Sequence, residues 1–176
     1  DKDIVILSDE VYEHIIFDGY EHQSVARFPE LAKRSFIISS FGKTYHTTGW
    51  KLGYVLAPEN LMTEFRKVHQ YNVFSVNTPI QVAYAGLMRE KDLFLELGNF
   101  YQEKRDYFAT LLKASRFTLK PVLGSYFQVV QYDKISAEKD IDFAQRMTRE
   151  MGVAPIPMSV FYNNHHDHHH LRFCFA

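Results

Sequence analysis

Three polar side chains with defined spacing, Ser40, Lys43 and Lys51, follow an apolar run at 36–38 that has the character of a buried strand. A second apolar run begins at Tyr54. A lysine whose amine is kept partly neutral by its surroundings can form a Schiff base with an aldehyde. The hydroxyl of Ser40 and the charge of Lys51 are both suited to holding a phosphate. On spacing alone, however, a lysine between strand ends is ordinarily a solvated loop residue.

A second polar group follows the apolar run at 4–7, which predicts a strand buried on both faces in a parallel sheet. Asp9, Glu10 and Tyr12 come at its carboxyl end, where open α/β sheets bind their ligands. Turn chemistry alone would explain an aspartate there. Glu10 is interpreted as a surface or structural carboxylate.

Arg172 lies in the middle of another apolar run, Leu-Arg-Phe-Cys-Phe, which predicts a strand. A buried arginine requires a partner. One interpretation is that Arg172 forms a salt bridge or lies on an edge strand. The other is that its guanidinium binds a substrate carboxylate through two hydrogen bonds. Cys174, the single cysteine, is predicted to be a small buried residue of this strand, and its isolation suits a reducing cytoplasm.

These motifs resemble those of the pyridoxal-phosphate-dependent aminotransferases of class I/II, which have fold type I. The resemblance rests on Ser-x-x-Lys followed by Gly-Trp-Lys-Leu-Gly-Tyr, on Asp-x-x-Tyr after a strand, and on the Arg-Phe-Cys-Phe strand. The string at 71–79 is similar to the methionine and kynurenine (glutamine) aminotransferase group. Many relatives carry arginine where Lys51 stands, and lysine keeps the charge but gives up the planar grip.

The resemblance implies pyridoxal phosphate as cofactor and a role for each site residue. Lys43 would be the catalytic lysine, which holds the cofactor and then moves the substrate proton as base and acid. Asp9 would pair with the pyridine nitrogen, and Tyr12 would bond the ring's phenolic oxygen. Ser40 and Lys51 would hold the phosphate, and Arg172 would bind the substrate carboxylate. No metal is expected at this site.

The resemblance also implies an α/β fold in two parts. Residues 1–92 would be the C-terminal part of a large cofactor-binding domain with a mostly parallel sheet, and residues 93–176 an incomplete α+β small domain. Within the second part, one helix is predicted from about 92 to 113. Its expected core stripe consists of five apolar residues: Leu93, Leu97, Phe100, Phe108 and Leu111.

Composition limits the partners. The chain of 176 residues is 46% hydrophobic and has a net charge of -1, so we expect no nucleic-acid partner, and no apolar run predicts a membrane span. The resemblance implies a homodimer for the full-length protein, with Phe74, Ser75 and Asn77 at the interface. The chain begins at Asp1 rather than at a methionine, an apolar run follows almost at once, and Ala176 comes directly after another apolar run. Neither end has the polar, frayed character usual of natural termini, so we expect a fragment of a longer polypeptide.

Five of the nine histidines fall between 165 and 170, and imidazoles are good ligands for zinc or nickel. Their spacing matches no helical or hairpin arrangement that would preorganise a site, so a variable surface loop is the preferred interpretation. For the activity, the expected reaction is transamination between an α-amino acid and an α-keto acid. Elimination from a sulfur amino acid, which would use the same Lys43, Asp9 and Tyr12, and a catalytically incompetent module remain as alternatives.

Overall fold

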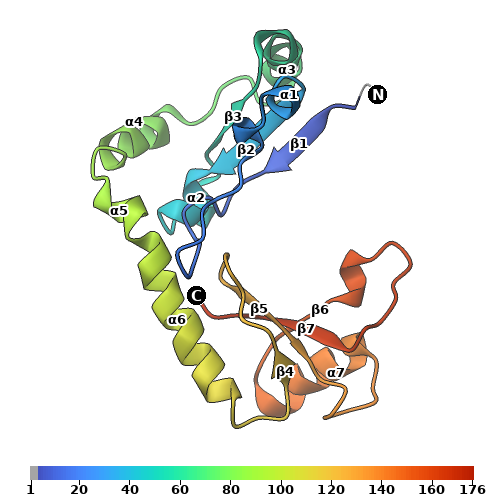
Figure 1. Cartoon of the computed structure of the whole chain (residues 1–176). Helices are drawn as coiled ribbons and strands as arrows, with labels where there is room; N and C mark the ends of the chain where they lie inside the picture. The colour runs from blue at the N-terminus through green and yellow to red at the C-terminus, as the bar shows by residue number, and fades with distance from the viewer. Residues whose placement is uncertain (1–3) are drawn as a thin grey trace. The chain divides into compact units, whose positions relative to one another are not determined.

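The computed structural model describes residues 4–176, which form two compact units with the limits Asp1–Gly98 and Asn99–Ala176 (Figure 1). The sequence prediction divided the chain between residues 92 and 93. In the structure, the helix α6 (Leu97–Leu112) runs across the division between the units. Across residues 4–176, no helix combines the length and the apolar character needed to cross a membrane.

The first unit contains a three-stranded sheet with the order β1-β2-β3. Strand β1 (Ile6–Asp9) is parallel to β2 (Ser35–Ser40), and β2 is antiparallel to β3 (Gly53–Leu56). The loop before β2 carries the short helix α1 (Pro29–Ala32), which begins at a proline. Helix α2 (Phe41–Thr44) follows directly from β2, as Figure 1 shows.

The prediction that the run at 4–7 is buried on both faces is wrong. The strand is present and its pairing with β2 is parallel, but Leu7 is 71% exposed and Ile4 is 52% exposed. Within residues 4–176, β1 lies at the edge of its sheet and pairs only with β2. An apolar run indicates that burial would stabilise a strand, but it does not identify a neighbouring element that covers the strand.

Helix α3 (Glu59–Asn72) begins after Pro58, and α4 (Thr78–Leu87) begins after Asn77. The Asn77 side chain accepts a hydrogen bond from the Ile80 amide at 3.1 Å, which satisfies one of the unpaired donors at the start of α4. Phe65 of α3 packs on Phe36 of β2 with 6.0 Å between ring centroids, which covers one face of the sheet.

The single helix predicted for 92–113 is two helices, α5 (Asp92–Leu95) and α6, separated at Glu96. The predicted core stripe is also partly wrong, because Leu93, Phe100 and Leu111 are exposed. Leu97 is buried as predicted, and the other buried residues of α6 are Tyr101 and Arg105, so that burial recurs every four positions.

Arg105 explains why the sequence misplaced this stripe. Its guanidinium is buried because it donates to the Val122 carbonyl at 2.9 Å and pairs with Asp106 at 2.7 Å. A helical pattern based on apolar residues alone overlooks a buried arginine. It therefore predicts that neighbouring apolar residues are buried.

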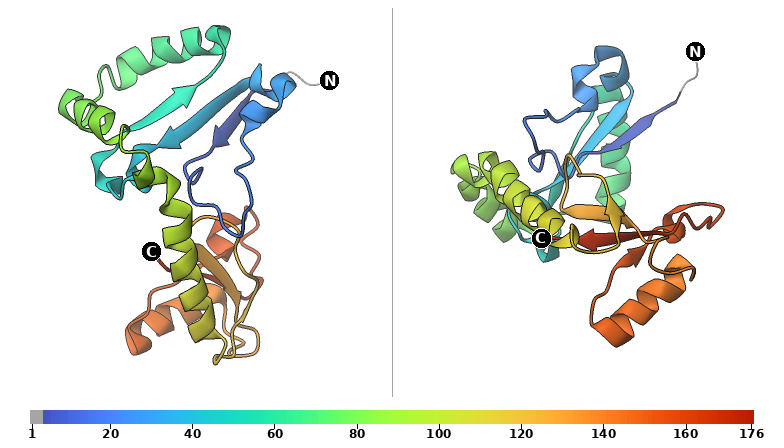
Figure 2. Two further views of the ribbon diagram at one scale, coloured as in Figure 1. Left: turned by 60° about the vertical axis from the view of Figure 1, so that its left-hand side comes forward. Right: turned by 60° about the horizontal axis from the view of Figure 1, so that its bottom comes forward.

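The second unit contains a four-stranded antiparallel sheet with the order β4-β5-β7-β6. Its strands are β4 (Thr118–Leu119), β5 (Phe127–Gln131), β6 (Ile156–Pro157) and β7 (His170–Cys174). Helix α7 (Asp140–Arg146) continues as a π-helical turn (Met147–Met151) and ends at Gly152, whose φ of 69° is the left-handed conformation in which glycine commonly closes a helix. Figure 2 shows α7 against this sheet.

The core of the second unit lies between α7 and the sheet. Its buried members are Val130, Tyr132, Phe143, Ala144, Met147 and Leu171. Since side chains alternate along a strand, Leu171 and Phe173 of β7 face this core and Arg172 and Cys174 face away from it. The prediction of a buried Cys174 is therefore wrong: the strand is correct, but the cysteine is exposed on the opposite face.

Candidate active site

The predicted cofactor-binding residues of the first unit gather at one edge of its sheet. Asp9 is the last residue of β1 and is paired with Ile38 of β2, so both parallel strands end close together. Ser40 is the last residue of β2, and Lys43 lies in α2 immediately beyond it. This is the carboxyl edge of the parallel pair, the position at which α/β sheets bind ligands.

Lys43 lies beside Tyr12. The Lys43 ammonium is 6.0 Å from the centroid of the Tyr12 ring, which belongs to the turn after β1. Both side chains are half-buried. Residues 31 positions apart in the sequence thus come together because β1 and β2 run in the same direction.

Ser40 and Lys51 are brought together by the pairing of β2 with β3. Ser40 is paired with Gly53, and its hydroxyl donates to the Leu52 carbonyl at 3.3 Å, one residue from Lys51. The same hydroxyl accepts a hydrogen bond from the Gly42 amide at 3.2 Å and so caps α2. Lys51 is exposed and has left-handed backbone angles, with φ 54° and ψ 46°.

Two glycines permit this close packing. A Cβ atom at Gly53 would lie 2.4 Å from the Ser39 carbonyl oxygen, and one at Gly42 would lie 2.9 Å from the Thr48 Cα. Neither position accepts a side chain without a shift of the backbone, so both glycines are required by the approach of β3 and of the following turn to β2.

Tyr84 of α4 packs against residues 41–47, the segment that contains Lys43. It is 1% exposed, stacks on Phe41 with 4.9 Å between ring centroids, and is hydrogen-bonded through its hydroxyl to Thr47. The four-residue helix α2 is too short to be stable alone. Its position therefore depends on this aromatic packing and on the Ser40 cap.

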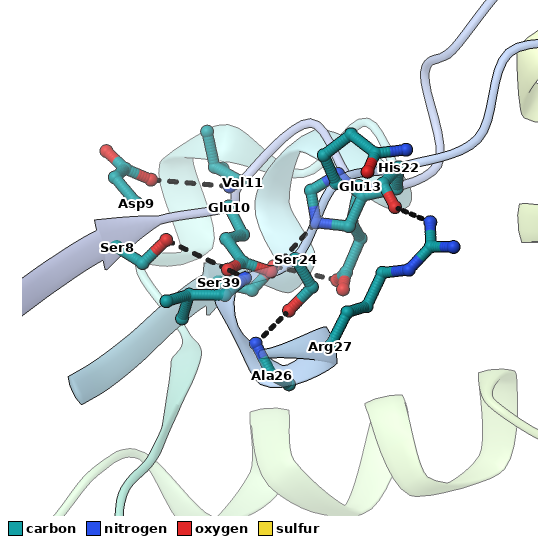
Figure 3. A network of polar contacts seen from close by, with 12 residues as sticks. Ser8, Asp9, Glu10, Val11, Glu13, His22, Ser24, Ala26, Arg27 and Ser39 are labelled. Atoms are coloured by element: carbon teal, nitrogen blue, oxygen red, sulfur yellow. Dashed lines mark hydrogen bonds and ion pairs between the residues drawn. The ribbon is translucent and has the colours of Figure 1, made fainter. Parts of the chain in front are cut away.

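Asp9 is exposed, and its Oδ1 accepts a hydrogen bond from the Val11 amide at 3.3 Å. This is the turn chemistry that the sequence also allowed for. The next residue, Glu10, is structural: it is 6% exposed and accepts hydrogen bonds from His22 at 2.8 Å and from the Val25 amide at 3.0 Å (Figure 3).

The environment of Glu10 changes its acidity. Burial would raise the pKa of Glu10, but the hydrogen bonds that the carboxylate accepts, that from His22 foremost, outweigh burial and hold the pKa below its usual value. The charged carboxylate is thus the form that the fold stabilises. It ties the end of β1 to the loop that carries His22.

Glu13 is a residue that sequence reasoning missed. Its Oε1 accepts hydrogen bonds from the Ser39 hydroxyl at 2.8 Å and from the Tyr54 hydroxyl at 2.7 Å, and Figure 3 shows Glu13 together with Ser39. A signal was present in the sequence, because a carboxylate inside the mostly apolar stretch 11–17 needs partners. Neighbouring His14 has its pKa lowered by burial, although Glu13 acts in the opposite direction.

Arg172 belongs to the second unit and lies on the face of β7 opposite the core. Its guanidinium carbon is 4.1 Å from the centroid of the Phe127 ring and 5.0 Å from that of Phe161. The Arg172 Nε is buried and has no hydrogen-bond partner, and among residues 4–176 no carboxylate forms an ion pair with this side chain. The salt bridge allowed by the sequence is not present in the described part of the chain.

The histidine-rich segment at 165–170 forms a loop that leads into β7. The His166 and His168 ring centroids are 4.4 Å apart, and His169 stacks on Tyr132 at 5.2 Å. Asp167 anchors the loop, because its Oδ2 accepts a hydrogen bond from the Asp140 amide at 2.8 Å. No group of three or more ligating side chains among residues 4–176 is arranged to hold a metal.

Residues 1–176 match the family described as aminotransferase class I and II, and the chain belongs to this family. The methionine aminotransferase of Escherichia coli strain K12 is 49% identical over 175 residues, which are 99% of this chain and 45% of that enzyme. Human kynurenine–oxoglutarate transaminase 1 is 34% identical over 198 residues, covering 99% of this chain and 46% of that enzyme.

Solved structures show the same relationship. A structure from Escherichia coli, whose study identifies a methionine aminotransferase function, matches with a TM-score of 0.93 at 48% identity over 97% of this chain and 46% of that chain. The N-succinyldiaminopimelate aminotransferase of Mycobacterium tuberculosis matches with a TM-score of 0.91 at 33% identity over 98% of this chain and 46% of that chain. The chain thus spans less than half the length of these relatives.

These matches confirm the predicted fold class. The chain is α/β, and its structural neighbours are aminotransferases of fold type I. Members of the family use pyridoxal phosphate and act on amino acids and keto acids.

Proposed function

We propose that this chain contributes the cofactor lysine and the substrate-binding arginine to a transamination between an α-amino acid and an α-keto acid. The observation that carries the proposal is the position of Lys43 at the carboxyl edge of the parallel strands, beside Tyr12. It is supported by membership of the aminotransferase class I and II family.

The residues at this edge provide the chemical groups that pyridoxal phosphate requires. Lys43 would hold the cofactor through its amine. Asp9 would face the pyridine nitrogen, Tyr12 the phenolic oxygen, and Ser40 with Lys51 the phosphate. When bound, the cofactor supplies an electron sink that stabilises negative charge at the substrate's α-carbon.

Lys43 has a second role in the proposal. Its amine would accept the proton from the substrate's α-carbon and would later return a proton to complete the transfer. The Tyr12 ring beside the ammonium orients the lysine for both tasks.

Arg172 would bind the α-carboxylate of the substrate. The buried Nε without a partner supports this, because a donor left unsatisfied in the folded chain is costly and a bound carboxylate would satisfy it. The rings of Phe127 and Phe161 flank the guanidinium and fix the plane in which it presents its donors.

We also propose a homodimer that uses the segment at 74–77, and a cytoplasmic location, which the single cysteine supports. Phe74 is 81% exposed and has a φ of 64°, an unusual backbone for a bulky residue. An exposed aromatic held in that conformation suits an interface better than solvent. Asn77, by contrast, already has a role within the chain as the cap of α4.

The experiment that tests the reaction class measures turnover of methionine and kynurenine, the amino acids named for its relatives, with and without an added α-keto acid. Transamination predicts turnover that depends on the keto acid and produces its amino acid. Release of ammonia and pyruvate from a sulfur amino acid without keto acid would establish elimination instead. Lys43→Ala is the matched control, since it removes the amine on which both reactions depend.

A further inference from the structure

Glu13 joins three parts of the first unit that lie far apart in the sequence. It belongs to the turn after β1, where its amide donates to the Glu10 carbonyl at 3.0 Å. Its carboxylate reaches Ser39 of β2 at 2.8 Å and Tyr54 of β3 at 2.7 Å through the same oxygen, Oε1. One carboxylate therefore fixes the turn to two strands.

The two donors are placed next to the residues that order the proposed cofactor site. Ser39 precedes Ser40, and Tyr54 follows Gly53, while Ser40 and Gly53 pair directly in the sheet. Tyr12 immediately precedes Glu13 in the turn. The contacts of Glu13 therefore determine where the Tyr12 ring lies relative to the strand end from which α2 and Lys43 emerge.

We infer that Glu13 is a positioning residue, whose hydrogen bonds to Ser39 and Tyr54 hold the Tyr12 turn against the ends of β2 and β3 and thereby keep Tyr12 beside Lys43. This inference rests on the proposed function, because it assigns the placement of Tyr12 to the needs of the cofactor site. Glu13 itself is given no contact with the cofactor or with substrate.

Burial and acidity make this contact a persistent one. The Glu13 side chain is 22% exposed and Ser39 is 3% exposed, so water competes weakly for these bonds. Burial and, after it, the hydrogen bond to Glu13 raise the pKa of Tyr54 to about 12, so the phenol remains a donor throughout the neutral range. His14 also approaches the carboxylate, with 3.7 Å between its Nε2 and Oε1.

The first test asks whether Glu13 holds the turn, independently of any cofactor. Amide hydrogen exchange of residues 12–15 is measured in the wild-type chain and in Glu13→Ala, Ser39→Ala and Tyr54→Phe. We expect about tenfold faster exchange in Glu13→Ala and a smaller increase in each of the other two variants, because each of these removes one of the two bonds. Unchanged exchange in Glu13→Ala would overturn the inference.

Ser35→Ala is the matched control. Ser35 is also a buried hydroxyl of β2, 1% exposed, and it bonds the Leu31 carbonyl at 2.6 Å at the opposite end of the strand. Its loss should leave exchange at 12–15 within about twofold of wild type. An equal increase in Ser35→Ala would mean that the turn responds to general loosening of the strand, and would contradict a specific role of Glu13.

The second test asks whether the turn matters to the cofactor site. The pH titration of the absorption of added pyridoxal phosphate bound to the protein is compared in wild type, Glu13→Ala and Glu13→Gln. We expect at least about tenfold weaker binding and a displaced titration midpoint in Glu13→Ala, and recovery to within about threefold in Glu13→Gln, whose amide oxygen still accepts both bonds. A purely structural role would leave the midpoint in place.

The outcomes separate this inference from the proposed function. If the wild-type protein binds no pyridoxal phosphate at Lys43, the proposed function fails, and the exchange measurement alone decides whether Glu13 holds the turn. If the wild type binds it and Glu13→Ala gives the same affinity and midpoint, the proposed function stands and the positioning role is refuted.

Discussion

Two charged residues of the second unit, Asp140 and Arg172, have opposite environments: Asp140 is buried, whereas Arg172 is half-buried. Asp140 is 1% exposed, and its two oxygens accept hydrogen bonds from the Ser159 amide and hydroxyl, both at 2.7 Å. Arg172 has aromatic rings on two sides and a buried Nε without a hydrogen-bond partner.

The difference distinguishes a charge that stabilises the fold from a charge that we propose binds a ligand. A buried charge whose hydrogen bonds are all made within the chain strengthens the fold, and its removal leaves its partners unpaired. A charged group with a buried donor that lacks a partner contributes little to the stability of the fold. The desolvation penalty of that donor is offset when a ligand accepts its hydrogen bond. By this criterion Glu10 and Glu13 resemble Asp140, whereas Arg172, which we propose binds the substrate carboxylate, keeps a buried donor without a partner.

The largest expected effect is on substrate binding at Arg172. Arg172→Lys keeps the charge but loses the planar pair of donors, so the affinity for an amino acid substrate should fall about 100-fold. The spectral response of the cofactor-loaded protein to added amino acid measures this affinity. Arg172→Met should change the free energy of unfolding by no more than about 1 kcal/mol. An Arg172→Met variant that unfolds readily would assign the arginine to the fold instead.

Asp140 should give the opposite result. Asp140→Ala leaves the Ser159 amide and hydroxyl without their acceptor, so the free energy of unfolding should fall by about 2–4 kcal/mol in urea titrations. Asp142→Ala is the control, because Asp142 lies in the same helix and is exposed. Similar losses in both variants would show that the helix, and not the buried carboxylate, determines the effect.

Glu10 should make a pH-dependent contribution. Because its pKa in the folded protein lies below the ordinary value of 4.5, its stabilising contribution is present above pH 4.5 and is lost as the pH falls through the lowered pKa. Glu10→Gln should therefore be less stable than wild type by about 1.5 kcal/mol at neutral pH, and the difference should narrow below pH 4.5. Urea titrations across this range measure it.

The control for this prediction is Glu21→Gln, since the Glu21 side chain is 76% exposed. Its stability should differ from wild type by less than about 0.5 kcal/mol at every pH. A constant difference between wild type and Glu10→Gln down to strong acid would contradict the assignment of the lowered pKa to Glu10.

The smallest expected effect is spectroscopic. Because the pKa of Tyr54 is raised to about 12, Tyr54→Phe should remove a phenolate transition near that pH from the ultraviolet titration of the protein. The folded protein should also lose stability as the pH rises from 10, the ordinary tyrosine value, towards 12. Glu13→Gln should move the transition to lower pH, since it removes a charge that opposes ionisation. Removal of a transition at the ordinary value by Tyr54→Phe would refute the contact with Glu13.

Much of the fold was predictable because local signals agreed with it. Apolar runs located β2 and β7, Pro58 and Asn77 marked the helix starts, and Gly152 closed the last helical segment. What failed was burial, since it depends on neighbours that a run of residues does not name. Leu7 and Cys174 are exposed for this reason, one on an edge strand and the other on the face away from the core.

The residues of the candidate site were likewise predictable only in part. The spacing of Ser40, Lys43 and Lys51 is a local motif, and the sheet places it at the expected edge. That Glu13 needs partners could be predicted, but their identity could not, because they lie 26 and 41 residues away in the chain. The Arg172 Nε has no hydrogen-bond partner among the described residues, and this could be recognised only from the packed sheet.

The most direct test of the account is borohydride reduction in the presence of pyridoxal phosphate, followed by mass mapping of the peptides. We expect a phosphopyridoxyl group on Lys43 and none after Lys43→Arg, because Lys43 is the amine placed beside Tyr12 at the strand ends. Absence of the adduct, or labelling spread over the surface lysines, would contradict the assignment of this edge as the cofactor site.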